Sequence, residues 1–136
     1  MTSAQIREMI QFRMRQAHET ILEAEVLIGA SSWRGAINRA YYAMFYAVLA
    51  LSALKQVDAS RHSGIITFFD REFVKPGIFK KELSKKFHFA FDNRQIHDYG
   101  ETIIVEESIA IETLSDARSF VDSIERYLDT SIFPSL

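Results

Sequence analysis

The sequence lacks the residues that build disulfide-linked or zinc-bound scaffolds. Its 136 residues include no cysteine and only two prolines. The absence of cysteine excludes a disulfide framework and a cysteine-ligated zinc site, and it is typical of proteins from a reducing cytoplasm. No His-x-x-x-His pair and no repeated Glu-x-x-His pattern takes the place of cysteine. We therefore expect no metal and no cofactor.

Long apolar runs and an excess of one charge are also missing. The longest apolar stretch, from Ala40 to Leu51, is far shorter than the roughly 20 residues that cross a bilayer. The N-terminal residues lack the uninterrupted apolar segment of a signal peptide. The 16 basic residues nearly balance the 18 acidic ones, so no long-range basic field marks a nucleic-acid binder. We expect a cytoplasmic protein without a membrane partner, and any RNA contact must come from a local patch.

Apolar residues recur at intervals of three and four along most of the chain, which predicts helices. Five are expected, over about 6–28, 33–54, 60–73, 79–99 and 110–128. The second is apolar nearly all round, so it should be the central helix. Thr2 or Ser3 can cap the first helix, and Ser31 or Ser32 the second. The sequence therefore predicts one all-α domain over residues 1–136, an up-and-down antiparallel bundle of about five helices.

The second predicted helix carries a guanidinium at the edge of a tyrosine-rich apolar surface. In the segment RGAINRAYYAMFYAVLAL, Arg39 precedes Tyr41 and Tyr42. Two interpretations stay open. Either the methylene groups of Arg39 lie along the apolar surface while its guanidinium reaches water, or the guanidinium has a partner at the helix surface. The tyrosines are interpreted mainly as core residues, because a stripe of aromatic residues at helical spacing usually packs.

The segment FDNRQIHDYGE in the fourth predicted helix gathers polar groups on one turn. Arg94 lies three residues before His97 and four before Asp98, with Tyr99 beside them. A fixed cation, an imidazole and a carboxylate are the groups needed to hold a phosphodiester and to move a proton of a ribose 2′-hydroxyl. The alternative is an Arg94–Asp98 ion pair on a helix surface, with His97 as a solvated side chain.

The remaining histidines and the lysines of the fourth predicted helix indicate no specific function. No function follows for His18 or His88, and the role of His62 at the start of the third helix stays open. The lysines between Lys80 and Lys86 form either a solvated helix face or a basic patch that attracts RNA toward Arg94. The salt dependence of RNA binding would distinguish these two interpretations.

Three segments in order, NRAYYAMFYAVLALSAL, RHSGIITFFDREFVKPG and RQIHDYGE, resemble the HEPN domain family, specifically its compact stand-alone bacterial and archaeal members. The resemblance covers about residues 33–101, half the chain. It implies a small antiparallel helical bundle, usually a homodimer whose two fourth helices share one cleft. It also implies that the polar residues of the second helix approach the Arg94 segment, so that Arg39 pairs with Asp98.

The resemblance also implies an activity. Catalytic members are metal-independent ribonucleases in which four to six residues separate an arginine from a histidine. Here only Gln95 and Ile96 stand between Arg94 and His97, whereas Arg94, Asp98 and Tyr99 match the R-x-x-x-D-Y form of the stand-alone subgroup. A further family feature is a tyrosine that a partner minimal nucleotidyltransferase modifies with AMP, and Tyr99 matches it. A packed Tyr99 whose hydroxyl pairs with a neighbouring helix is the alternative.

Two functional hypotheses follow. In the first, the protein is a dimeric endoribonuclease toxin of a toxin–antitoxin pair, with His97 as the proton shuttle and Arg94 as the phosphate clamp. In the second, it is a non-catalytic nucleotide- or RNA-binding partner of a nucleotidyltransferase, in which Arg94, Asp98 and Tyr99 hold the dimer or the ligand.

Overall fold

The computed structural model describes residues 1–59, 62–99 and 106–133, with the backbone alone at residues 62, 63 and 97–99. Every regular element within these ranges is a helix. In chain order they are α1 (Ser3–Gly29), α2 (Trp33–Lys55), α3 (His62–Phe69), η1 (Asp70–Val74), α4 (Lys81–Tyr99), α5 (Glu107–Tyr127) and η2 (Leu128–Ile132), of which η1 and η2 are π-helical. The prediction of an all-α bundle is confirmed.

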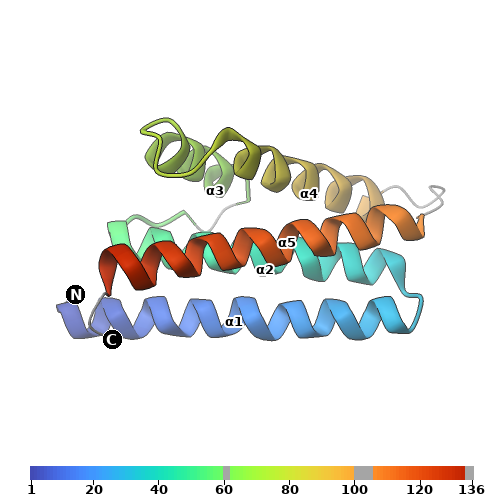
Figure 1. Ribbon diagram of the computed structural model, residues 1–136, viewed down its shortest axis with the longest axis horizontal. Coiled ribbons are helices and arrows are strands. Elements are labelled where there is room, and N and C mark those ends of the chain that lie inside the picture. Colours follow the sequence, from blue (N-terminus) through green and yellow to red (C-terminus); the bar gives the residue numbers. More distant parts are fainter. Residues whose placement is uncertain (60–61, 100–105, 134–136) are drawn as a thin grey trace.

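The helices form two layers (Figure 1). Three long helices, α1, α2 and α5, lie side by side, and α3 and α4 lie across α2 and α5 as a second layer. The structure brings α2 into contact with α1, α3, α4 and α5. This central position explains why α2 is apolar nearly all round, as the sequence indicated.

Capping follows the prediction at α1 but not at α2. Thr2 forms a capping box, because its side chain accepts from the Gln5 amide while the Gln5 side chain accepts from the Thr2 amide. Ser32 occupies the predicted N-cap of α2, yet its side chain makes no capping hydrogen bond. Its ψ of 76° lies away from the extended value of a hydroxyl cap, so the predicted hydroxyl cap was wrong.

The third predicted helix continues from α3 into the π-helical turn η1, which periodicity could not reveal. After the Pro76-Gly77 break, where Gly77 adopts a φ of +86°, α4 begins at Lys81. Phe79, which was predicted to lie on the fourth helix, therefore lies before its first residue. Lys86, expected on the exposed face, is half-buried and donates to the Ser119 hydroxyl at 2.9 Å.

Aromatic side chains pack between the two layers and hold them together. Phe87 of α4 is fully buried and its ring lies 6.0 Å from that of Tyr41 on α2, 5.8 Å from Phe69 on α3 and 5.1 Å from Phe120 on α5. One side chain thus contacts three helices, and burial of a ring of this size contributes roughly 1.5–3 kcal/mol. This contact fixes which face of α4 looks into the bundle.

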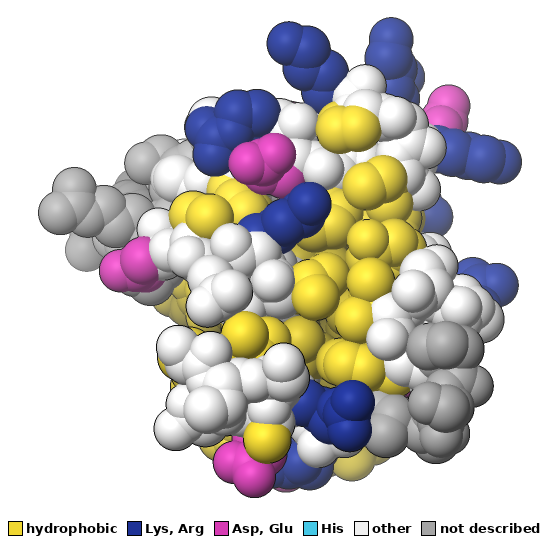
Figure 2. All heavy atoms as spheres, turned by 90° about the vertical axis from the view of Figure 1, so that its left-hand side faces the viewer, with side chains coloured by type: hydrophobic (Ala, Val, Ile, Leu, Met, Phe, Trp, Pro, Cys, Tyr) yellow, Lys and Arg dark blue, Asp and Glu magenta, His cyan; other side chains and the backbone are white. Residues whose placement is uncertain are grey.

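The end of the bundle that carries both termini exposes apolar surface. Figure 2 looks onto this end and shows apolar side chains across its middle, with lysine and arginine side chains around them. A shallow groove between the start of α1 and the end of α2 opens here, lined in part by Met1, Met9 and Val57. Among the residues described, no helix combines the length and the apolarity that a membrane crossing requires.

Candidate functional site

Arg94 lies on the inward face of α4, which packs against α2. Phe87, Ala90 and Arg94 follow one another at helical intervals, and all three are buried. Phe91, half-buried on the same side, lies 5.9 Å from the ring of Tyr41. Because Phe87 anchors this face in the core, Arg94 two turns later must also point toward α2.

Arg94 lies against two tyrosines and is only 9% exposed. Its Nη2 donates to the Tyr42 hydroxyl at 3.2 Å. Its Cζ lies 5.4 Å from the ring centroid of Tyr42 and 5.6 Å from that of Tyr41, within the range of cation–π attraction. The guanidinium is therefore oriented by aromatic rings and a phenol, and only its edge reaches solvent.

Arg39 approaches the same tyrosine from within α2. Its Cζ lies 4.9 Å from the Tyr42 ring centroid, and its Nε and Nη2 donate to the Asn38 side-chain oxygen at 3.1 and 2.8 Å. Arg39 is half-buried, so it is more accessible than Arg94. Two guanidinium groups therefore gather at one tyrosine ring, and we call Arg39, Tyr42 and Arg94 the two-arginine cluster.

Tyr41 forms the apolar floor beneath the cluster. It is fully buried, and burial raises the pKa of its hydroxyl above the ordinary tyrosine range; the Arg94 charge lowers that pKa and Tyr42 raises it. Its ring stacks on Phe87 at 6.0 Å. Tyr41 therefore stays a neutral phenol at physiological pH and excludes water from below Arg94.

The remaining predicted site residues lie in the last turn of α4. His97, Asp98 and Tyr99 belong to the helix, but their side chains lie outside the described residues, as does that of His62. The predicted Arg39–Asp98 pair and the approach of His97 to Arg94 consequently stay predictions. His18 and His88 lie elsewhere in the fold, paired with Glu125 and Asp70.

The chemistry of the two-arginine cluster suits an anion. Guanidinium groups bind phosphate oxygens in a planar, bidentate geometry, and a low-dielectric aromatic floor strengthens such contacts. No group of three potential metal-ligating side chains occurs in the part of the chain that the structure describes. The cluster itself is cationic and aromatic and offers a metal ion no carboxylate.

The sequence did not single out Tyr42, which orients Arg94. A signal was present, since Arg39 and Tyr42 are three residues apart and must share a face of α2. What the sequence could not supply is the crossing of α4 over that face, which brings Arg94 to the same ring.

Comparison with known proteins shows which family the chain belongs to. The sequence model of the HEPN domain matches residues 10–127. A UPF0332 protein of Thermotoga maritima is 38% identical over 122 residues, 90% of this chain and 92% of the relative. Two Methanocaldococcus jannaschii proteins are named "Putative toxin MJ0605" and "Putative toxin MJ0142". They are 32% and 30% identical, over 90% and 85% of this chain and 91% and 78% of their own lengths. A helical bundle of this arrangement, a family match over most of the chain and relatives aligned over most of their lengths lead to one conclusion: the chain belongs to the HEPN domain family.

Proposed function

We propose that this protein is a toxin-type HEPN subunit that binds RNA at the two-arginine cluster and cleaves it without a metal ion. The observation that carries the proposal is the convergence of Arg39 and Arg94 on Tyr42. The names of the two archaeal relatives support a toxin role. His97, one turn beyond Arg94 on α4, is the proposed proton-transfer group.

The proposed reaction is an internal transfer within the RNA chain. The ribose 2′-oxygen attacks the adjacent phosphorus, the bond from phosphorus to the 5′-oxygen breaks, and a 2′,3′-cyclic phosphate forms. One base accepts the 2′-hydroxyl proton and one acid protonates the departing 5′-oxygen. His97 performs one of these transfers and, in a homodimer with a shared cleft, the His97 of the second subunit performs the other. Arg94 stabilises the negative charge that develops on the phosphoryl oxygens.

Regulation by a partner enzyme forms part of the proposal. A minimal nucleotidyltransferase would bind the dimer, and the Tyr99 oxygen would attack the α-phosphorus of ATP and release pyrophosphate. The AMP attached to Tyr99 would place bulk and negative charge beside Arg94 and so exclude an RNA phosphate. Intact-mass spectrometry after co-expression tests this step: we expect an AMP-sized increase that Tyr99→Phe abolishes.

A second candidate is a non-catalytic RNA- or nucleotide-binding subunit, and two observations favour it. Arg94 is 9% exposed, so a phosphate can meet only the edge of its guanidinium. Only two residues separate Arg94 from His97, fewer than the four to six expected of catalytic members of the family. In this candidate Arg39, the more accessible cation, makes the main phosphate contact and no bond is cleaved.

Cleavage of a labelled single-stranded RNA in excess EDTA distinguishes the two candidates. We expect the wild-type protein to produce fragments with cyclic phosphate ends and His97→Ala to produce none. His88→Ala is the matched control, because His88 lies on the same helix and pairs with Asp70 away from the cluster. Binding without cleavage by the wild-type protein would support the second candidate, and cleavage that His97→Ala leaves intact would exclude His97 from the reaction.

A further inference from the structure

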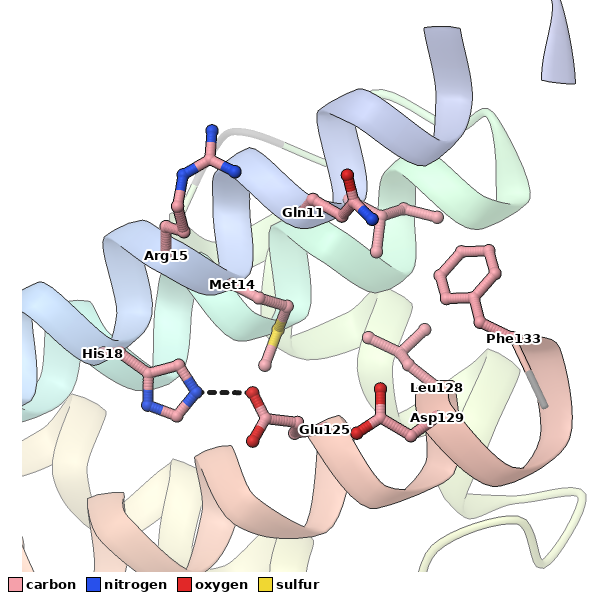
Figure 3. A pocket seen from close by; sticks show the side chains of 9 residues that line it. Gln11, Met14, Arg15, His18, Glu125, Leu128, Asp129 and Phe133 are labelled. Atoms are coloured by element: carbon pink, nitrogen blue, oxygen red, sulfur yellow. Dashed lines mark hydrogen bonds and ion pairs between the residues drawn. The ribbon is translucent and has the colours of Figure 1, made fainter. Parts of the chain in front are cut away.

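A hollow lies far from the two-arginine cluster, between the first half of α1 and the end of α5 with the following turn η2 (Figure 3). It has a volume of about 290 Å³, and at about 30 Å³ per water molecule it accommodates a ligand of roughly ten non-hydrogen atoms. The two helices are joined on one side of it by the pair between His18 and Glu125. The hollow is therefore an opening in the bundle wall with a defined edge.

The floor of this hollow is apolar and preformed. Ile10, Met14 and Leu128 line it and are 1%, 7% and 2% exposed. Phe133 adds a half-buried aromatic ring at one end. Water in contact with such a floor gains little hydrogen bonding, so its replacement by an apolar ligand body is favourable.

The π-helical turn η2 is what brings the aromatic ring to the hollow. The Phe133 amide donates to the Leu128 carbonyl at 2.7 Å, an i to i−5 bond that places these two residues one above the other. A regular α-helix would align Leu128 with residue 132 and rotate position 133 away. π-helical turns are frequent at functional sites, because they reposition a side chain in this way.

The charge on the α5 side of the hollow is negative. Glu125 and Asp129 are four residues apart and line the same wall. Glu125 pairs with His18, whereas the Asp129 side chain makes no hydrogen bond or ion pair with any other residue that the structure describes. Arg15 also lines the hollow, but in Figure 3 its guanidinium points away from the two carboxylates. The exposed Asp129 carboxylate is therefore available to a cationic group at this wall.

We propose that this hollow binds a small organic cation, a primary amine on an apolar or aromatic body. The ammonium group lies at Asp129 and donates to its carboxylate, while the body covers Met14 and Leu128 and its edge meets the Phe133 ring. The thioether of Met14 favours such a ligand, because sulfur contacts aromatic groups well.

Three probes of one shape test the proposal. Titration of 2-phenylethylamine, 2-phenylethanol and 3-phenylpropionate is followed by calorimetry and by the methyl signals of ¹³C-labelled methionines. We expect saturable binding of the amine that shifts the Met14 signal, with the alcohol at least about tenfold weaker and the carboxylate weaker still. Equal affinity for amine and alcohol, or no saturable binding of the amine, would overturn the proposal.

A matched pair of variants tests the assigned contact. Asp129→Asn removes the unpaired negative charge of the hollow and leaves Glu125 in place. Asp122→Asn makes the same change two turns earlier on α5, where Asp122 pairs with Arg126 outside the hollow. Both residues are exposed, so both variants should keep the wild-type melting temperature within a few degrees. We expect Asp129→Asn alone to weaken amine binding by about tenfold or more. Equal loss in both variants, or loss in neither, would contradict the assignment.

Discussion

Among single residues, Tyr42 is central to the proposed RNA site, because it contacts both of the arginines there. Its hydroxyl accepts a hydrogen bond from Arg94, and its ring lies 4.9 Å from Arg39 and 5.4 Å from Arg94. Removing the hydroxyl leaves the ring in place but removes the hydrogen bond that orients the Arg94 Nη2. The tyrosine thus acts through arginine and needs no contact with RNA.

Tyr42→Phe should weaken RNA binding by about two- to tenfold, the loss of one hydrogen bond worth roughly 0.5–1.5 kcal/mol. Fluorescence anisotropy with a labelled single-stranded RNA measures this change. Tyr46→Phe serves as the control, since Tyr46 is a half-buried tyrosine one turn later on the same helix. An unchanged affinity in Tyr42→Phe would show that the hydroxyl does not position Arg94.

Tyr41 gives a prediction about pH. Burial raises its pKa in the folded protein, so above the ordinary tyrosine range the unfolded chain releases a proton that the folded chain keeps. Stability present at neutral pH is therefore lost as the pH rises past the unfolded pKa. Urea unfolding at neutral and alkaline pH should show a smaller loss in Tyr41→Phe than in the wild type. Equal losses would mean that Tyr41 ionises freely in the fold.

At the scale of elements, Asp70 joins the π-helical turn η1 to α4. Its carboxylate accepts from the Ser84 hydroxyl at 2.6 Å and pairs with His88 Nε2 at 2.7 Å. Ser84 and His88 lie one turn apart on α4, so one carboxylate fixes the outer edge of this helix while Phe87 fixes its inner face. The Phe87 contact sets the direction of Arg94, whereas the Asp70 contacts add to the stability of the first half of α4.

Asp70→Asn should lower the free energy of unfolding by about 0.5–1 kcal/mol, a small value because the contacts are partly exposed. Urea denaturation monitored by circular dichroism measures the difference. Asp92→Asn, an exposed change on α4 itself, should leave stability unchanged. Equal destabilisation by both variants would argue against a specific Asp70 contact.

The elements also show what a sequence can predict. The start of α2 at Trp33 and the inward face of α4 follow from periodicity, since a repeat of three and four needs no knowledge of partners. The π-helical turns at Asp70–Val74 and Leu128–Ile132 were missed, because they use the same residues as α-helix and arise from packing. Of the two-arginine cluster, the sequence predicted Arg39 and Arg94 as site residues. It could not predict that both contact the Tyr42 ring, because that contact depends on how α4 crosses α2.

At the scale of the whole molecule, the proposed mechanism requires two subunits, each supplying one proton-transfer group to a shared cleft. Multi-angle light scattering at micromolar concentration should therefore give twice the 15.7 kDa mass of the chain. A mass that stays at one chain across the concentration range would remove the two-histidine mechanism. It would leave the candidate of a non-catalytic RNA- or nucleotide-binding subunit in place.

The central claim is that the two-arginine cluster is the RNA-binding site, and the affinity of Arg94→Gln for single-stranded RNA across a salt series tests it most directly. Glutamine keeps a polar side chain at this position but carries no charge, and circular dichroism verifies that the variant stays folded. We predict binding about tenfold or more weaker and a salt slope smaller by about one, while Arg118→Ala on α5, which only loses its pair with Glu25, binds as the wild type does. A folded Arg94→Gln protein with wild-type affinity and salt slope would contradict the account.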